Sequence, residues 1–107
     1  MFDFLALGKK LERVVKPKWD SDTYDVNNES TKEYVHIVIY CKGKSFACIN
    51  INRDYMDGRK KKIRLQPLID VDLEGFWHYG NSVEYPFDIK PSKIYKYWIS
   101  EINRMWY

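Results

Sequence analysis

The sequence predicts an α+β fold: an antiparallel meander sheet of three to four strands, with an amphipathic helix at each end of the chain and both helices packed on one face. Apolar residues recur at helical spacing in the first and last stretches, whereas β-branched runs separated by turn residues occupy the middle. The chain has 107 residues, 45% hydrophobic and 31% charged, which is typical of one globular domain. We therefore expect a single domain spanning residues 1–107.

The first predicted helix covers residues 2–16. Asp3 lies near its start, Gly8 interrupts it only mildly, and Pro17 is expected to end it. Its apolar stripe, which we expect to pack on the sheet, consists of Phe4, Leu7, Leu11, Val14 and Val15.

Residues 18–33, "KWDSDTYDVNNESTKE", are predicted to form a long loop, because they are rich in Asp, Asn and Ser and show no sustained period. The carboxylates Asp20, Asp22 and Asp25 lack the glycine and the final glutamate of a calcium-binding loop. We therefore expect no metal there.

Residues 33–52, "EYVHIVIYCKGKSFACININ", predict a β-hairpin. A three-residue loop, Lys42–Lys44, separates the side chains best, because it places the aliphatic residues of both strands on one face. That face would hold Val35, Ile37, Ile39, Cys41, Ala47, Ile49 and Ile51, and the other His36, Val38, Tyr40, Phe46, Cys48 and Asn50. Cys41 and Cys48 would then point to opposite sides, where no disulfide can join them.

The stretch "DGRKKKIRLQP", residues 57–67, carries four consecutive cations and continues into the next strand. Ile63 and Leu65 would join the aliphatic face, and the basic row would lie on the face of Tyr40. Rings beside cations on an open sheet are what single-stranded nucleic acid uses, since rings stack on bases and cations meet phosphates. Candidate nucleic-acid-binding residues are Tyr40, Phe46, Arg59, Lys60, Lys62 and Arg64.

Residues 68–75, "LIDVDLEG", offer a different explanation of the basic row. If they form the next strand, Asp70, Asp72 and Glu74 would lie opposite the cations and neutralise them as cross-strand ion pairs. The row would then be a solvated sheet face.

Residues 75–88, "GFWHYGNSVEYPFD", are predicted to be a loop that either covers the polar face of the sheet or presents its rings to a partner. The chain is 17% aromatic, more than a core of this size needs to bury. The candidate partner-binding residues in this segment are Phe76, Trp77, His78, Tyr79 and Tyr85.

The second predicted helix follows Pro91 and Ser92, which are typical of a helix start. Its apolar stripe consists of Ile94, Trp98, Ile99, Ile102, Met105 and Trp106.

These features favour a small non-catalytic protein that acts through protein–protein contacts, such as an inhibitor or accessory factor of the kind that phages and mobile elements encode. The net charge of +3, from 18 basic and 15 acidic residues, favours nucleic acid only weakly. Single-strand DNA or RNA binding is the alternative, and a small toxin-like ribonuclease is the second alternative.

The sequence shows no phosphate-binding loop, nucleophile elbow or zinc motif, so we expect no catalytic residues, cofactor or metal. A metal site or a general acid–base pair could be built from His78 with Asp70, Asp72 and Glu74, but alternating acids on a strand are usually solvated. No apolar run is long enough to cross a bilayer, and the first residues make a poor secretory signal. We therefore expect a cytoplasmic protein that does not bind membranes.

Overall fold

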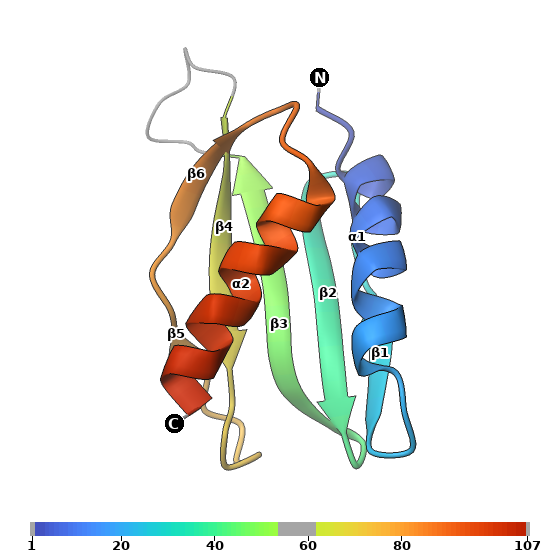
Figure 1. The fold of residues 1–107 in the computed structure, drawn as a ribbon, viewed down its shortest axis with the longest axis vertical. Helices are drawn as coiled ribbons and strands as arrows, with labels where there is room; N and C mark the ends of the chain where they lie inside the picture. The colour runs from blue at the N-terminus through green and yellow to red at the C-terminus, as the bar shows by residue number, and fades with distance from the viewer. Residues whose placement is uncertain (1, 54–61, 107) are drawn as a thin grey trace.

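The computed structural model describes residues 2–53 and 62–106, and it arranges them as a layer of two helices on one antiparallel sheet (Figure 1). The helices are α1 (Phe4–Trp19) and α2 (Pro91–Trp106). The strands are β1 (Tyr24–Asn28), β2 (Tyr34–Cys41), β3 (Lys44–Arg53), β4 (Lys62–Ile69), β5 (His78–Tyr79) and β6 (Val83–Pro86). The predicted α+β class with a helix at each end is confirmed.

The sheet is larger than predicted, with six strands among the described residues instead of three to four. Two segments that were predicted to be loops pair with its edges: β1 with β2, and both β5 and β6 with β4. In β1 only Val26 is buried, and so short a strand shows no alternation that a sequence pattern could reveal.

The hairpin of β2 and β3 has the predicted register in its body, where Ile37 lies opposite Ile49 and Ile39 opposite Ala47. The turn itself has two residues, Lys42 and Gly43, with φ of 53° and 77°. Such a two-residue turn of left-handed residues matches the twist of a hairpin. A β-bulge next to Ile39 then restores the predicted register, because it leaves one residue of β3 without a partner.

Helix α1 runs past Pro17 to Trp19, one turn further than predicted. A proline in the last turn removes one helical hydrogen bond, and the amide of Asp20 still donates to the carbonyl of Lys16 at 2.9 Å. The last turn is held from outside, since the Trp19 indole donates to the Tyr95 hydroxyl at 3.0 Å and packs edge-on against Trp98.

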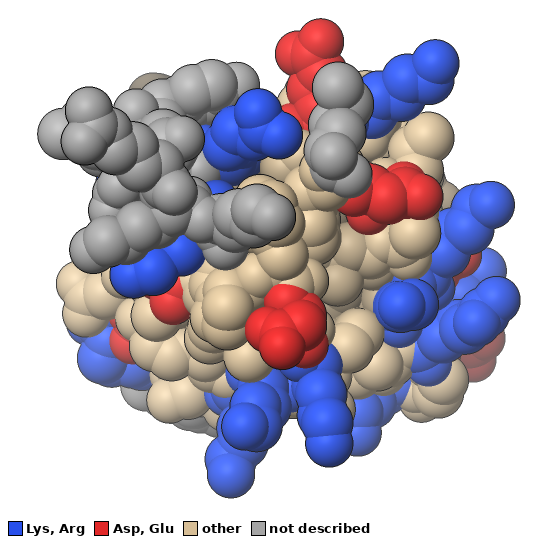
Figure 2. Space-filling model, turned by 90° about the horizontal axis from the view of Figure 1, so that it is seen from above, with Lys and Arg blue, Asp and Glu red and all other residues tan. Residues whose placement is uncertain are grey.

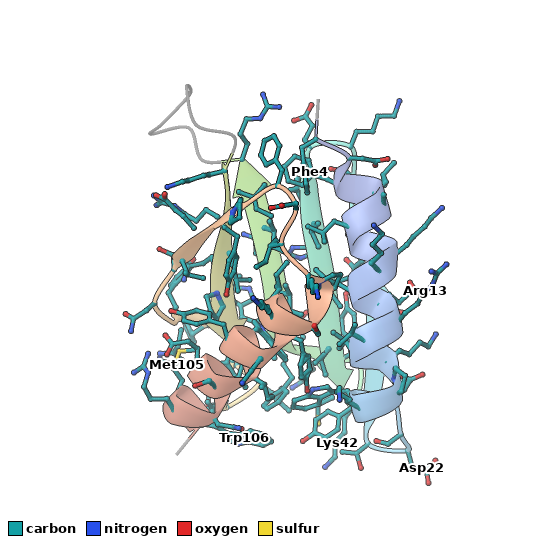
Figure 3. All side chains as sticks on the ribbon, turned by 45° about the horizontal axis from the view of Figure 1, so that its top comes forward. Phe4, Arg13, Asp22, Lys42, Met105 and Trp106 are labelled. Atoms are coloured by element: carbon teal, nitrogen blue, oxygen red, sulfur yellow. The ribbon has the colours of Figure 1, made fainter. Side chains whose placement is uncertain are left out.

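Both helices cover the aliphatic face of the sheet, as predicted, and their polar faces carry Lys and Arg side chains seen at the margins of Figure 2. The side chains of both layers meet in one core, seen between the ribbons in Figure 3. Trp98 is its largest fully buried residue, and its indole donates to the Cys48 carbonyl at 2.8 Å. Other fully buried members include Leu11, Ile37, Ile49, Leu65 and Ile102.

Candidate binding face

The face of the sheet that points away from both helices, the open face, is the candidate site. Figure 1 places α1 and α2 on the same side of the sheet, and side chains alternate along each strand, so the neighbours of core residues point to the other side. The open face therefore holds His36, Val38 and Tyr40 of β2, with Cys48 opposite Val38 and Leu68 opposite Cys48.

A small apolar patch lies at the centre of the open face. Val38, Cys48 and Leu68 are only 2%, 0% and 7% exposed, although they lie on the side away from both helices. Tyr40 and Trp77 pack against them. Because Trp77 follows β4 in the chain and contacts side chains of β2, β3 and β4, the segment before β5 must fold over the face.

Two exposed rings lie within two residues of Trp77 in the chain. Phe76 is 70% exposed and Tyr79 is 69% exposed, the largest values among the big apolar residues that the structure describes. Tyr79 pairs with Leu68 and therefore points to the open face. Trp77 thus covers the sheet, as one of the two alternatives predicted, whereas Phe76 and Tyr79 are exposed to solvent and their contact with a partner stays a prediction.

The other two predicted partner-binding residues are placed elsewhere. His78 is exposed but pairs with Ile69, a core residue, so it points to the helix side of the sheet. Tyr85 pairs with Ile63 and packs against the main core, and burial raises the pKa of its hydroxyl. Tyr85 is therefore not on the open face with Trp77 and Tyr79, because the strand alternation of β6 turns it towards α2.

Two titratable groups at the apolar patch, the Tyr40 hydroxyl and the Cys48 thiol, have a raised pKa. The Tyr40 hydroxyl donates to the Glu29 carboxylate, and this hydrogen bond raises the pKa of the tyrosine. The Cys48 sulfur lies 3.5 Å from Nδ1 of His36, and burial raises the pKa of the thiol well above its usual range. A thiol that is buried and protonated is a poor nucleophile.

The described part of the basic row is paired with Glu84, which is not one of the predicted partners. Glu84 of β6 lies opposite Arg64, with Arg64 Nη2 at 3.3 Å and Lys62 Nζ at 3.7 Å from its carboxylate oxygens. Arg59 and Lys60 lie outside the described residues. The expectation of cross-strand pairing is thus met at Lys62 and Arg64, but by a different strand.

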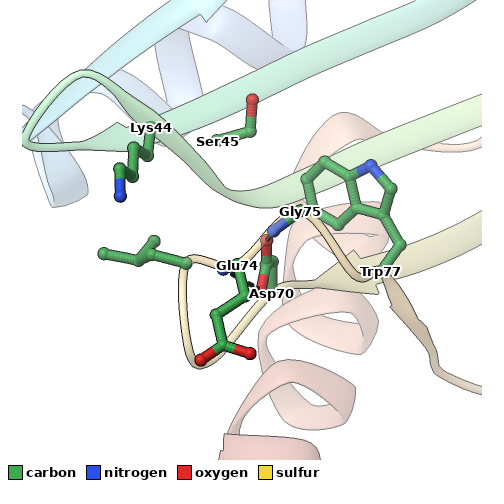
Figure 4. Close-up of a pocket in the computed structure, with 7 residues that line it drawn as sticks. Lys44, Ser45, Asp70, Glu74, Gly75 and Trp77 are labelled. Atoms are coloured by element: carbon green, nitrogen blue, oxygen red, sulfur yellow. Dashed lines mark hydrogen bonds between the residues drawn. The ribbon is translucent and has the colours of Figure 1, made fainter.

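The predicted partners Asp70, Asp72 and Glu74 do not form a strand opposite the cations, because β4 ends at Ile69 and a turn follows. Asp70 is 4% exposed, and its carboxylate accepts from the amides of Glu74 and Gly75 at 3.2 and 2.7 Å. This turn lines one side of a pocket of about 630 Å³, with Trp77 and Lys44 at its other walls (Figure 4). The acid that was considered as a metal ligand therefore organises a loop.

Phe46 was expected on the open face but is buried between the layers, at 4% exposure. It contacts the rings of Trp19, Tyr24 and Trp106. The bulge in β3 is the reason, because it shifts Phe46 out of the alternation that its neighbours follow. Phe46 is therefore not available to stack on a base.

The outer edge of β1 is occupied by groups of its own chain. The Val26 amide donates to the Asp20 carboxylate at 3.1 Å, and the Tyr24 amide donates to the Ser21 hydroxyl at 3.2 Å. An edge strand whose amides are already bonded is a poor template for an added strand. The open face is consequently a better candidate for docking than this edge.

Sequence reasoning missed Leu68 and Glu84. Leu68 follows a proline and could be read as part of the next segment, whereas the alternation of Val83, Glu84 and Tyr85 was a usable strand signal. No helix in the described part of the chain is long and apolar enough to cross a lipid bilayer. Comparisons of the chain with models of protein families, with curated proteins and with solved structures find no match.

Proposed function

We propose that the protein is a non-catalytic binding protein that docks a protein partner on its open face. The observation that carries this proposal is the pair of exposed rings, Phe76 and Tyr79, within two residues of Trp77, which covers the apolar patch. Large aromatic side chains around a desolvated centre are typical of the residues that dominate binding energy in protein interfaces. An inhibitor or accessory factor needs only such a surface.

A protein partner is better supported than single-stranded nucleic acid on this face. The described cations Lys62 and Arg64 share Glu84, which lowers the positive potential that phosphates require. The Tyr40 hydroxyl is bonded to another carboxylate, that of Glu29, and Phe46 is buried. The described cations of the basic row thus share a carboxylate, and one of the two rings predicted to stack on bases is buried.

The experiment compares partner capture by the native protein with capture by the double variant Phe76→Ala, Tyr79→Ala, using extract from source cells with and without nuclease treatment. Because both rings are about 70% exposed, their removal should leave the thermal midpoint nearly unchanged. We expect the native protein to capture a protein partner under both conditions, and the double variant to bind it at least about tenfold more weakly.

The matched control is Leu5→Ala, which truncates an exposed apolar residue of the helix layer, 39% exposed, and should retain full capture. Two results would contradict the proposal: undiminished capture by the double variant, or loss on nuclease treatment of the partner whose capture depends on Phe76 and Tyr79. A large drop in the thermal midpoint of the double variant would show that the two rings serve the fold instead.

A further inference from the structure

Positive charge is concentrated in the helix layer. Helices α1 and α2, of 16 residues each, contain eight cations and two acids, a net charge of +6. The whole chain has a net charge of +3, so the remaining residues are net −3. The modest overall charge is therefore the sum of two basic helices and an acidic remainder of the chain.

Six of these cations are exposed and have no ion-pair partner among the residues that the structure describes. We call them the basic helix layer: Lys9, Lys10, Arg13, Lys16, Lys93 and Lys96. The other two helix cations are engaged, since Arg104 pairs with Glu101 at 3.0 Å and Lys18 lies over the Tyr95 ring.

The cations of α1 form a row on its outer side. Lys9, Arg13 and Lys16 are four and three residues apart, which places them on one face of a helix. The core stripe of Leu7 and Leu11 lies on the other side, and Figure 3 shows Arg13 extending away from the sheet. Seen along the molecule in Figure 2, Lys and Arg side chains project on the sides where Figure 1 places the helices.

This arrangement departs from an ordinary solvated helix face. Glu12 and Lys16 have the favourable spacing of an acid followed four residues later by a cation, but Lys9 and Arg13 are like charges at the same spacing. Glu12 is the one acidic residue of α1, which has five cations. A row of like charges costs stability, and binding of an anion would offset this cost.

We propose that the basic helix layer binds the phosphate backbone of duplex nucleic acid, without reading its sequence. Lysines with nearby Ser92 and Ser100 hydroxyls on the α2 surface are the groups that contact phosphates. A protein partner fits less well, because protein interfaces are depleted in lysine and enriched in rings. A membrane fits less well too, since Leu5 is the one large apolar residue exposed among the described residues of α1.

Duplex is favoured over single strands because the cation row has no exposed ring beside it. Among the described residues of the two helices, Trp106 is the single exposed ring, and it lies at the end of α2 against Trp19 and Phe46. Single-strand binding relies on base stacking, whereas duplex backbone binding requires charge alone. This inference goes beyond the protein-binding function, since helix layer and open face are on opposite sides of the sheet and can be occupied together.

The test measures binding of a labelled 20-base-pair duplex by fluorescence anisotropy between about 50 and 200 mM salt. Each neutralised phosphate contributes about −0.9 to the slope of log K against log salt concentration, so six contacts predict a loss of roughly 10³-fold over this range. The triple variant Lys9→Gln, Arg13→Gln, Lys16→Gln should bind more weakly, with a slope less steep by about 2 to 3.

The matched control removes the same charge from exposed positions of the sheet layer, as Lys32→Gln, Lys42→Gln, Lys44→Gln, and should keep the native slope. Circular dichroism verifies that both triple variants are folded. The proposal is overturned by absence of duplex binding at 50 mM salt, or by an equal loss in the control. Tighter binding to a single-stranded 20-mer or to anionic phospholipid vesicles than to the duplex would overturn it as well.

Discussion

At the scale of single residues, Gly8 shows how a local weakness in a helix can be a requirement of packing. A Cβ atom at this position would lie 2.5 Å from Oγ and 3.0 Å from Cβ of Ser30. Ser30 cannot turn away freely, because its hydroxyl accepts the His36 amide at 3.0 Å. The sequence marks Gly8 only as a mild interruption, since the contact joins residues that are distant in the chain.

We predict that Gly8→Ala lowers the free energy of unfolding by about 1–3 kcal/mol, although alanine is the better helix former by about 1 kcal/mol. Urea denaturation of Gly8→Ala, Ser30→Gly and the double variant checks the cause. If the clash with Ser30 is responsible, the double variant loses less than the sum of the two single losses. A Gly8→Ala protein more stable than the native one would refute the packing argument.

At the scale of elements, α2 holds the edge of the sheet that carries the exposed rings. Between β5 and β6 the Asn81 amide donates to the Glu101 carboxylate at 2.6 Å, and the Tyr97 hydroxyl donates to the Asn81 carbonyl at 2.9 Å. Gly80 passes close beneath α2, since a Cβ there would lie 3.0 Å from Cε of Met105. The last strands are thus fixed by side chains of a helix that follows them in sequence.

Hydrogen bonds from Arg104, and also the amide of Asn81, hold the pKa of Glu101 below its ordinary value, although burial opposes this. A lowered folded-state pKa means that the ionised group stabilises the fold at neutral pH. This contribution is complete above the unfolded pKa, about 4.3, and is lost as the pH falls through the lower folded value.

We therefore predict that Glu101→Gln lowers the free energy of unfolding at pH 7 by about 1–2 kcal/mol, and that the variant loses less stability than the native protein between about pH 5 and pH 3. Denaturant titrations over this range measure both effects. Glu33→Gln, at an exposed carboxylate, is the control and should follow the native curve. Parallel pH curves for the native protein and Glu101→Gln would rule out this role of the carboxylate.

The elements that could be predicted are those whose pattern is local and repeated. The stripes of both helices and the alternation from Val35 to Ile51 determine which side chains face the core, except for Phe46 at the bulge. The edge strands β1 and β5 could not be predicted in this way, because they are too short to show a pattern and are stabilised by pairing with β2 and β4. The apolar patch under Trp77 likewise depends on three strands and a loop that meet only in the folded chain.

At the scale of the whole molecule, the separation of charge should affect stability as well as binding. Lys9, Arg13 and Lys16 repel one another along α1, and the described ion pairs of the sheet face, both to Glu84, are exposed. Exposed ion pairs contribute little to stability, and salt weakens this contribution. Salt also weakens the repulsion in the helix layer, which raises stability. The balance favours stabilisation by salt, because more cations are unpaired than paired in the described residues.

We predict that raising the salt concentration from about 0.01 to 0.15 M, which shortens the screening length from about 30 to 8 Å, raises the thermal midpoint of the native protein. The variant Lys9→Gln, Arg13→Gln, Lys16→Gln should melt roughly 2–4 °C higher than the native protein at low salt and respond less to added salt, because its like charges are gone.

The sheet-layer variant Lys32→Gln, Lys42→Gln, Lys44→Gln should keep the native salt response. Thermal melts of the three proteins at both salt concentrations measure this. A native midpoint that falls with added salt would show that attraction between opposite charges, and not repulsion within the helix layer, dominates the electrostatics of the fold.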